Sequence, residues 1–196
     1  MTQVGGAWAR TGLTAATASV AVYNAANQLL GWNGTTFSPG PDANGNLQND
    51  GTNTYTWNAR NQLASISGGL SASFRYDAFG RRTRRVVNGT TTDFAYDGLN
   101  PIQELIGTNP PANILAGLGV DECFTRTDTA GRRSVLTDTL GSTVALTDDT
   151  GAAQGYTYEP FGKTTVSPAN GNTFQFTGRE NDGTGAFGTY SFGGRK

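Results

Sequence analysis

The sequence contains no histidine and only one cysteine, Cys123. Without histidine the chain cannot form a Ser-His-Asp triad, a Cys-His nucleophile or a zinc site with histidine ligands. A single cysteine also excludes an internal disulfide and a zinc cluster built from cysteines. Asp121 and Glu122 precede Cys123, and their negative charge opposes a reactive thiolate, so we expect a structural thiol.

Charged residues and long apolar segments are scarce as well. Charged residues make up 15% of the 196 residues and the formal net charge is −1, so we expect no binding to nucleic acid. No apolar run reaches the length of a membrane span, and residues 1–22 lack the pattern of a signal peptide. We therefore expect no membrane span, and a chain that is cytoplasmic or separated from its secretion signal.

Glycine, threonine, asparagine and aromatic residues are frequent instead. The sequence has 28 Gly, and its 10 Phe, 7 Tyr and 3 Trp are spread along the chain. Glycine and asparagine tolerate the positive φ of tight turns, whereas threonine and aromatic residues suit a pleated, half-buried surface. This composition predicts an all-β fold of short strands and tight turns.

One short pattern recurs along the chain: Asp, Asn or Glu is followed three residues later by Gly or Asn, and ten of these pairs carry the turn interpretation. In a type I turn with a G1 bulge, the first side chain accepts backbone hydrogen bonds and the last position takes positive φ. We interpret all ten pairs as structural turns. They are Asn24/Asn27, Asp42/Gly45, Asn58/Asn61, Asp77/Gly80, Asp97/Asn100, Asp128/Gly131, Asp138/Gly141, Asp148/Gly151, Glu159/Gly162 and Asp182/Gly185.

A catalytic interpretation of some of these acids is the alternative. Asp138, Asp148 and Asp149 could form a pair of carboxylates like that of a glycosidase. However, Asp138 and Asp148 each have a glycine three residues later, so a turn accounts for both positions. We therefore predict no catalytic residues, no metal site and no cofactor.

A second set of turn signals alternates with the first. Asn-Gly and Asp-Gly pairs favour hairpins, and roughly 8 to 11 residues between turns leave strands of ordinary length. An antiparallel meander ribbon with one aromatic, buried face is predicted. The turn signals are Asn33-Gly34, Asp50-Gly51, Ser67-Gly68-Gly69 and Asn88-Gly89, and the aromatic pairs are Tyr55/Trp57, Phe74/Tyr76, Phe94/Tyr96 and Phe174/Phe176.

Two segments depart from this pattern. Pro110 and Pro111 predict a loop, and the apolar run 113–120 is expected to form a buried strand, with a short helix as the alternative that its glycines disfavour. Four arginines form a basic cluster for which we expect a solvated strand with alternating pairs on both faces, rather than a phosphate site. They are Arg81, Arg82, Arg84 and Arg85.

Several motifs resemble units of the Rhs/YD-repeat family. Residues 76–82 resemble its Y-D-x-x-G-R unit, and residues 158–162 resemble its Y-D-P-F-G form. Residues 23–29 and 57–63 resemble the Y-N-x-x-N-x-L variant. Residues 176–182 resemble the F-T-G-x-E segment near the end of the Rhs core, and the resemblance covers about residues 8–185.

The resemblance implies a spiralling β-ribbon that closes into a hollow shell around a C-terminal toxin, secreted or at the cell surface. In family members the core ends with a tyrosine-rich run and a D-P-x-G motif that is associated with self-cleavage. Residues 186–196 contain neither. Self-cleavage and toxicity are therefore not carried over, and the chain is interpreted as a truncated C-terminal core region.

We expect three parts: a lead-in of strand or loop (1–22), the ribbon (23–185), which curls into part of a shell or an open curved sheet, and a divergent, disordered tail (186–196). The expected function is structural and non-catalytic, with other parts of a shell or copies of the chain as partners. Because a ribbon cut from a closed shell has two exposed edges, we expect an isolated chain that is marginally stable, oligomeric or prone to aggregate.

Two other functions are compatible with the sequence. In the first, the chain is a carbohydrate-binding or cell-surface interaction module, in which exposed aromatic residues such as Trp8, Trp32 and Trp57 stack on sugar rings. Pairing of these residues across strands is the simpler explanation. In the second, the chain is a degraded, immunity-linked or orphan fragment of a toxin.

Overall fold

A computed structural model describes residues 20–159 and 162–183 and is built almost entirely of β-strands. The predicted all-β fold is confirmed. Among these residues there is one short 3-10 helix, η1 (Phe176–Gly178), and no helix long and apolar enough to cross a membrane. The chain divides into two compact units, Met1–Gly51 and Thr52–Lys196, each considered by itself below. The expected tail 186–196 and most of the expected lead-in lie outside the described residues.

The first unit contains a three-stranded antiparallel sheet. Its strands are β1 (Ala21–Tyr23), β2 (Leu29–Trp32) and β3 (Thr35–Thr36). Asn33 and Gly34 join β2 to β3, and both have positive φ, as a type I′ hairpin turn requires. These strands form a sheet of their own, separate from the sheet that contains β4 to β15.

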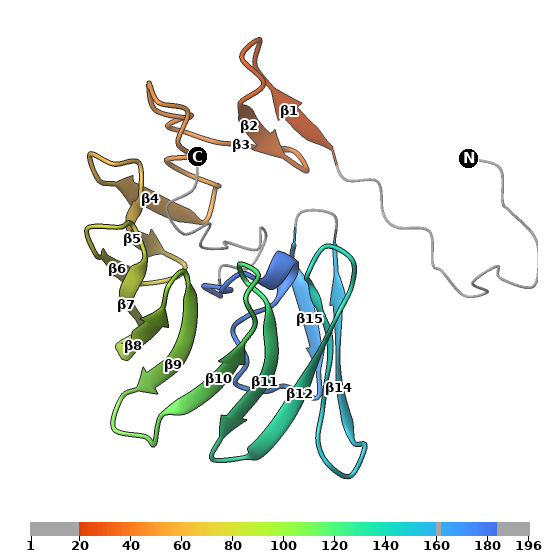
Figure 1. Cartoon of the computed structure of the whole chain (residues 1–196). Helices are drawn as coiled ribbons and strands as arrows, with labels where there is room; N and C mark the ends of the chain where they lie inside the picture. The colour runs from red at the N-terminus through yellow and green to blue at the C-terminus, as the bar shows by residue number, and fades with distance from the viewer. Residues whose placement is uncertain (1–19, 160–161, 184–196) are drawn as a thin grey trace, which may run out of the picture. The chain divides into compact units, whose positions relative to one another are not determined.

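The second unit is one twelve-stranded antiparallel sheet in which every strand pairs with its neighbours in sequence (Figure 1). This confirms the predicted meander. The sheet is curved and does not close, so β4 and β15 are its edges. The strands are β4 (Asn53–Trp57), β5 (Leu63–Gly68), β6 (Ala72–Tyr76), β7 (Arg82–Val87), β8 (Thr90–Asp97), β9 (Asn100–Ile106), β10 (Ala112–Ala116), β11 (Cys123–Asp128), β12 (Gly131–Thr137), β13 (Thr143–Thr147), β14 (Ala153–Tyr158) and β15 (Thr164–Ser167).

The turn motif has the same hydrogen bonds in six of the ten predicted turns. One carboxylate oxygen of Asp77 accepts bonds from the N–H groups of Phe79 and Arg81, both at 2.9 Å. The Gly80 N–H donates to the Asp77 carbonyl at 3.1 Å, and Gly80 has a φ of 85°, which favours glycine. One short side chain thus satisfies two donors that the chain reversal leaves unpaired. The same pair of bonds is found at Asn24, Asp42, Asn58, Asp138 and Asp148.

A β-bulge accompanies most of these turns and decides which side chains are buried. The pairing register shifts by one residue at Tyr76 and Arg82. Because of the extra residue, positions three apart at the start of the next strand lie on the buried face. The buried pairs are Leu63/Ile66 on β5, Arg82/Arg85 on β7 and Thr143/Leu146 on β13.

The bulge overturns our prediction for the arginine cluster. A solvated strand was expected, but Arg82 is only 2% exposed and Arg85 is 9% exposed. Arg81 and Arg84 are the more exposed members, and each forms an ion pair with one acid, Asp77 and Asp93 respectively. Simple alternation fails here because the bulge places Arg82 and Arg85, rather than Arg82 and Arg84, on one face.

The tyrosine that starts the motif donates a hydrogen bond to the bulge of the neighbouring strand. The Tyr76 hydroxyl donates to the Leu63 carbonyl at 2.9 Å, and the Tyr96 hydroxyl donates to the Arg82 carbonyl at 2.9 Å. Each acceptor stands at the bulge of the adjacent strand. Burial raises the pKa of both tyrosines, so the hydroxyls stay protonated and act as donors.

Aromatic residues share the buried face in three of the four predicted pairs. Tyr55, Phe74 and Phe94 are buried, and Trp57, Tyr76 and Tyr96, which are two residues further along, are half-buried. The pair Phe174/Phe176 is not part of a strand. Phe174 lies in an isolated bridge with Glu180, Phe176 begins η1, and Gln175 between them is also buried. The prediction of a strand was wrong there.

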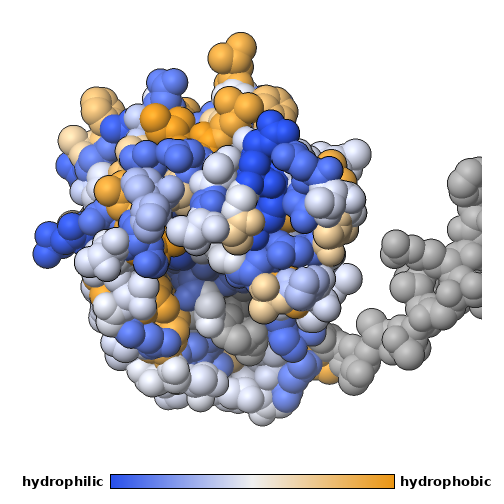
Figure 2. Space-filling view, turned by 90° about the horizontal axis from the view of Figure 1, so that it is seen from below, coloured by the Kyte–Doolittle hydropathy of each residue, from blue (hydrophilic) through white to orange (hydrophobic). Residues whose placement is uncertain are grey.

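The proline-containing segment follows its prediction only in part. A loop does precede β10, and Ala112–Ala116 forms a strand. The strand alternates between buried and exposed positions instead of being buried throughout, and the chain then turns at residues 117–122. Leu118 in this turn is fully exposed. On the face that Figure 2 shows, apolar residues lie in patches among polar ones.

We predict that Tyr96→Phe lowers the free energy of unfolding of the second unit by about 1–3 kcal/mol, because the buried Arg82 carbonyl loses its donor. Chemical denaturation followed by circular dichroism measures the change. Tyr23→Phe, at the matching motif position where the side chain is 45% exposed, serves as the control and should leave stability unchanged. Equal effects of the two changes would contradict this role of the hydroxyl.

Candidate functional site

The concave face of the twelve-stranded sheet is the candidate site, because a later part of the chain docks on it. Residues 170–183, which we call the crossing segment, follow β15 and lie within the curve of the sheet (Figure 1). Their side chains and carbonyls contact strands from β14 to β7 without joining the ladder. Docking therefore buries polar groups of both the concave face and the segment.

The crossing segment has a shape of its own. The Asn181 N–H donates to the Thr173 carbonyl, and the Gln175 N–H donates to the Arg179 carbonyl, both at 2.8 Å. The Asn181 side chain donates to the Gln175 side chain at 2.7 Å, and η1 closes the loop. These internal hydrogen bonds restrict the conformations of the segment, so docking costs less conformational entropy.

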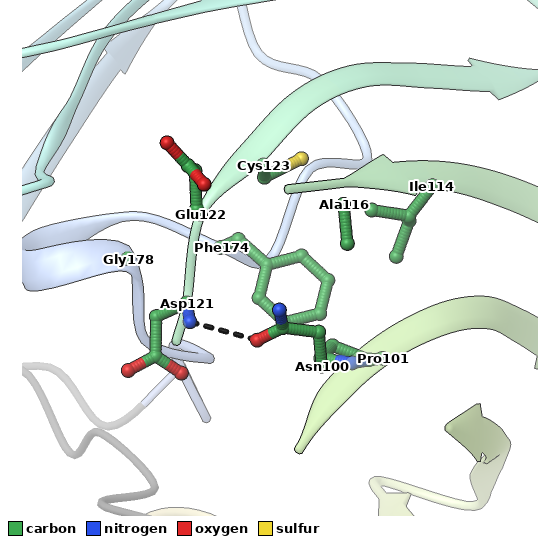
Figure 3. Close-up of a pocket in the computed structure, with 9 residues that line it drawn as sticks. All are labelled: Asn100, Pro101, Ile114, Ala116, Asp121, Glu122, Cys123, Phe174 and Gly178. Carbon is green, nitrogen blue, oxygen red and sulfur yellow. Dashed lines mark hydrogen bonds between the residues drawn. The ribbon is translucent and has the colours of Figure 1, made fainter. Parts of the chain in front are cut away.

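An apolar anchor fixes the middle of the segment. Phe174 is buried against Phe94 and Ile114, and Cys123 packs against the same cluster. Figure 3 shows the ring of Phe174 among Ile114, Cys123 and Asn100, beside a cavity of ≈ 20 Å³ that has room for about one water molecule. Burial raises the pKa of the Cys123 thiol to about 11, so it stays protonated at neutral pH.

A buried ion-pair group fixes the end of the segment. Arg82 on β7 donates from Nη1 and Nη2 to the carboxylate of Asp182, at 2.6 and 3.0 Å, and from Nη1 to Glu180 at 3.0 Å. The guanidinium carbon of Arg82 lies 4.1 Å from the ring centroid of Phe74, which suits a cation–π contact. Arg85 donates to the Asn181 carbonyl at 3.1 Å. Two arginines of the sheet thus bind two acids and a carbonyl of the segment.

A second group of ion pairs lies further along the same face. Glu104 on β9 accepts hydrogen bonds from Arg126 on β11 and, at 2.7 Å, from the Thr173 hydroxyl of the crossing segment. Arg126 also donates to Asp128 at 3.2 Å, and Arg133 pairs with the same carboxylate. Glu104 and Arg126 are fully buried. Their charges compensate each other, which is the condition under which buried ions are tolerated.

Backbone bonds complete the docking. The Thr143 hydroxyl and N–H donate to the carbonyls of Phe174 and Gln175, at 2.8 and 3.0 Å. The Thr177 N–H donates to the Ser142 hydroxyl at 3.0 Å. Ser142 and Thr143 are nearly inaccessible to solvent, so these bonds satisfy buried polar groups at the bulge that begins β13.

Burial and neighbouring charges shift two pKa values at the ionic anchor. Burial alone would lower the pKa of Arg82, but the charges of Asp182 and Glu180 outweigh it, and the pKa is raised. Burial raises the pKa of Glu180 to about 7, against the opposing charge of Arg82. Arg82 is therefore always charged, whereas Glu180 titrates near neutral pH.

The predicted turn acids are dispersed along the chain instead of gathering around one cavity. Asp138 and Asp148 each accept backbone hydrogen bonds within their own turn, and Asp149 pairs with the exposed Arg132. The backbone carbonyl of Glu159 accepts the Gly162 N–H at 2.9 Å, and its carboxylate pairs with Lys163. Asp128 accepts the Ala130 N–H and also pairs with arginines of the concave face. Positive φ is found at Gly45, Gly80, Gly131, Gly141, Gly151 and Gly162.

The turn prediction for Asp97 and Asn100 needs correction. These residues pair with each other across a two-residue turn, and Gly98, not Asn100, has positive φ. Asn100 is buried and bonds instead to the carbonyls of Gly117 and Gly119 and to the Asp121 N–H. Its side chain holds the loop that precedes β11.

Asp182 also differs from its prediction. Its carboxylate was expected to cap a turn, but it is buried against Arg82 and belongs to the docking of the crossing segment. Its expected partner Gly185 lies outside the described residues. The pattern of an acid followed by glycine misleads here because a nearby guanidinium competes for the carboxylate.

Neither a metal site nor an exposed tryptophan platform stands out in the part of the chain that the structure describes. Within it, no three or more His, Cys, Asp or Glu side chains are grouped so that they could hold a metal ion. Trp32 and Trp57 are half-buried on their strands. Trp8 lies outside the described residues.

We predict that Arg82→Leu lowers the free energy of unfolding by about 3–5 kcal/mol, because two buried carboxylates lose their partner. Arg84→Leu, on the same strand but in an exposed pair with Asp93, is the matched control and should cause no measurable change. Thermal and urea denaturation of both variants provide the measurement. Equal stability of the two variants would show that the buried pair contributes nothing.

Comparisons with known proteins agree with the architecture. No family model matches the chain. The tRNA3(Ser)-specific nuclease WapA of Bacillus spizizenii and the tRNA nuclease WapA of Bacillus subtilis (strain 168) are each 37% identical over 95 residues. The match covers 45% of this chain and 4% of either relative. The chain therefore corresponds to a small part of these nucleases.

Solved toxin structures share the fold. The crystal structure of TcdB2-TccC3-TEV matches 79% of this chain and 9% of its own, with a TM-score of 0.58 and 20% identity. The Photorhabdus luminescens Tc holotoxin pore with a mutated TccC3 matches 90% of this chain and 11% of its own, with a TM-score of 0.63 and 17% identity. The chain thus shares the meandering ribbon fold of these toxin structures, and its turn motifs resemble those of Rhs/YD-repeat proteins.

Proposed function

We propose that the chain is a non-catalytic wall segment of an Rhs/YD-repeat shell, of the kind that encloses a C-terminal toxin in full-length relatives. The observation that carries this proposal is the twelve-stranded ribbon, which curves, does not close and ends at β4 and β15. The terminal strand of a sheet is the place where a further strand of a wall can pair.

The chemistry of the concave face supports a structural role. Its acids and arginines are bound to one another, as in the pairs Arg82–Asp182 and Arg126–Glu104. A catalytic acid or base has to reach a substrate proton, whereas these carboxylates already accept bonds from buried donors. The same pairs hold the crossing segment and so rigidify the wall.

Partners and location follow from the same proposal. The partners are other parts of a shell or copies of this chain, and the wall is secreted or exposed at the cell surface, as the family resemblance implies. The solved relatives are multi-chain assemblies that contain TcdB2 and TccC3. Nuclease activity of the WapA proteins is not proposed for this chain, which matches only 4% of their length.

The open edge provides the experiment. We predict that the purified chain self-associates with rising concentration and that Thr165→Lys on β15 weakens this association, because an edge lysine disfavours pairing with another strand. Sedimentation velocity over a range of concentrations measures it. Thr157→Lys is the matched control: Thr157 lies directly opposite Thr165 on the interior strand β14 and is likewise exposed.

Only the edge variant is expected to shift the chain toward monomer. A wild-type chain that stays monomeric and monodisperse at every concentration would contradict the proposed wall role. So would equal weakening by both lysines, since general surface charge rather than strand pairing would then control association.

A further inference from the structure

Beyond the role in a wall, we infer that the crossing segment is a pH-sensitive latch. Its docking on the concave face is strongest at acidic pH and weakens as the pH rises to neutrality. Glu180 is the group that controls it. Three features of the ionic anchor carry this inference: the sharing of one guanidinium, the composition of the surrounding charges and the burial of Glu180.

Glu180 is the weaker partner of Arg82. Both terminal nitrogens of Arg82 are bound to Asp182, at 2.6 and 3.0 Å, and Glu180 shares only Nη1, at 3.0 Å. Arg85, the other cation, is 3.8 Å from Asp182. A buried carboxylate with one shared donor is poorly compensated when it is charged. Protonation of Glu180 therefore removes a cost while Asp182 keeps Arg82 in place.

The charges that face Glu180 come from several elements. Arg82 and Arg85 on β7 are positive, and Asp182 of the segment itself is negative. Glu104 on β9 adds a further negative charge, which Arg126 already neutralises. Tyr76 on β6 and Tyr96 on β8 are the other titratable groups near Glu180, and their raised pKa values leave them uncharged around neutral pH.

The direction of the pH effect follows from linkage. An unburied glutamate has a pKa of 4.5, and burial raises the pKa of docked Glu180 to about 7. The docked state therefore holds a proton that the released state gives up between these values. Docking is strongest at low pH and weakens as the pH rises through this range, with the full loss present above about pH 7.

Cys123 reports on the latch because it is the one cysteine of the chain and packs against the apolar cluster that contains Phe174. Release of the segment uncovers the thiol, so that it reacts faster with a thiol reagent such as Ellman's reagent. The rate for the wild-type chain is divided at each pH by the rate for Glu180→Gln, which imitates the protonated acid. This ratio cancels the titration of the thiol itself.

We predict that the ratio rises about ten-fold between pH 6 and pH 8.5, while the far-ultraviolet circular dichroism of the sheet stays constant. Glu159→Gln is the control, since it neutralises an exposed glutamate outside the crossing segment, and it should keep the rise. A constant ratio would overturn the latch. A rise that Glu159→Gln also abolishes, or loss of the β-sheet signal over the same pH range, would overturn it too.

A second measurement covers the case in which Glu180→Gln does not fold. The labelling rate of the unaltered chain is then divided by its thiolate fraction, obtained from ultraviolet absorbance, and the same rise is expected. A corrected rate that does not change with pH refutes the latch. The wall role does not depend on this outcome, because association through β15 is measured separately.

Discussion

Arg82 takes part both in the local turn geometry of the sheet and in a long-range ion pair with the crossing segment. Its position on the concave face results from the bulge that follows the Asp77 turn, and its carbonyl accepts the hydroxyl of Tyr96 from the neighbouring strand. Its guanidinium then binds Asp182 and Glu180, about a hundred residues further along the chain. If Arg82 were not compensated, the curve of the sheet and the crossing segment could not share a buried interface. Local turn geometry thus prepares a long-range ion pair.

The ribbon itself is assembled from nearly independent units. Each turn is satisfied by one side-chain oxygen, and each bulge at Leu63 and Arg82 is closed by a tyrosine from the adjacent strand. Such local contacts explain how a sheet of twelve strands forms without an extensive aliphatic core. The concave face of the sheet is polar, because arginines and acids occupy positions where a compact domain would have leucine and valine. The crossing segment covers this face and pairs with its charged groups.

Much of the ribbon was predictable because its signals are local. The pair Asp77 and Gly80 fixes a turn by hydrogen bonding and by positive φ, and neither depends on distant residues. The docking of the crossing segment was not predictable in this way. Asp182 follows the turn pattern, yet it forms an ion pair with Arg82. No local sequence pattern marks Glu104, Arg126 or Glu180 as buried charged residues. The spacing of buried positions by three after each bulge, as in Arg82 and Arg85, is the signal that could have revealed the charged face.

The crossing segment is a fixed part of the concave face, held by the Arg82 and Glu104 ion-pair groups. Native-state hydrogen exchange followed by mass spectrometry tests this most directly, because the Gln175 and Asn181 amides are bonded only within the segment. At pH 6 we expect peptides that cover residues 173–181 to be protected to nearly the same degree as those of β7 and β13. Exchange of this segment at the rate of an unstructured peptide, while the strands remain protected, would contradict the account.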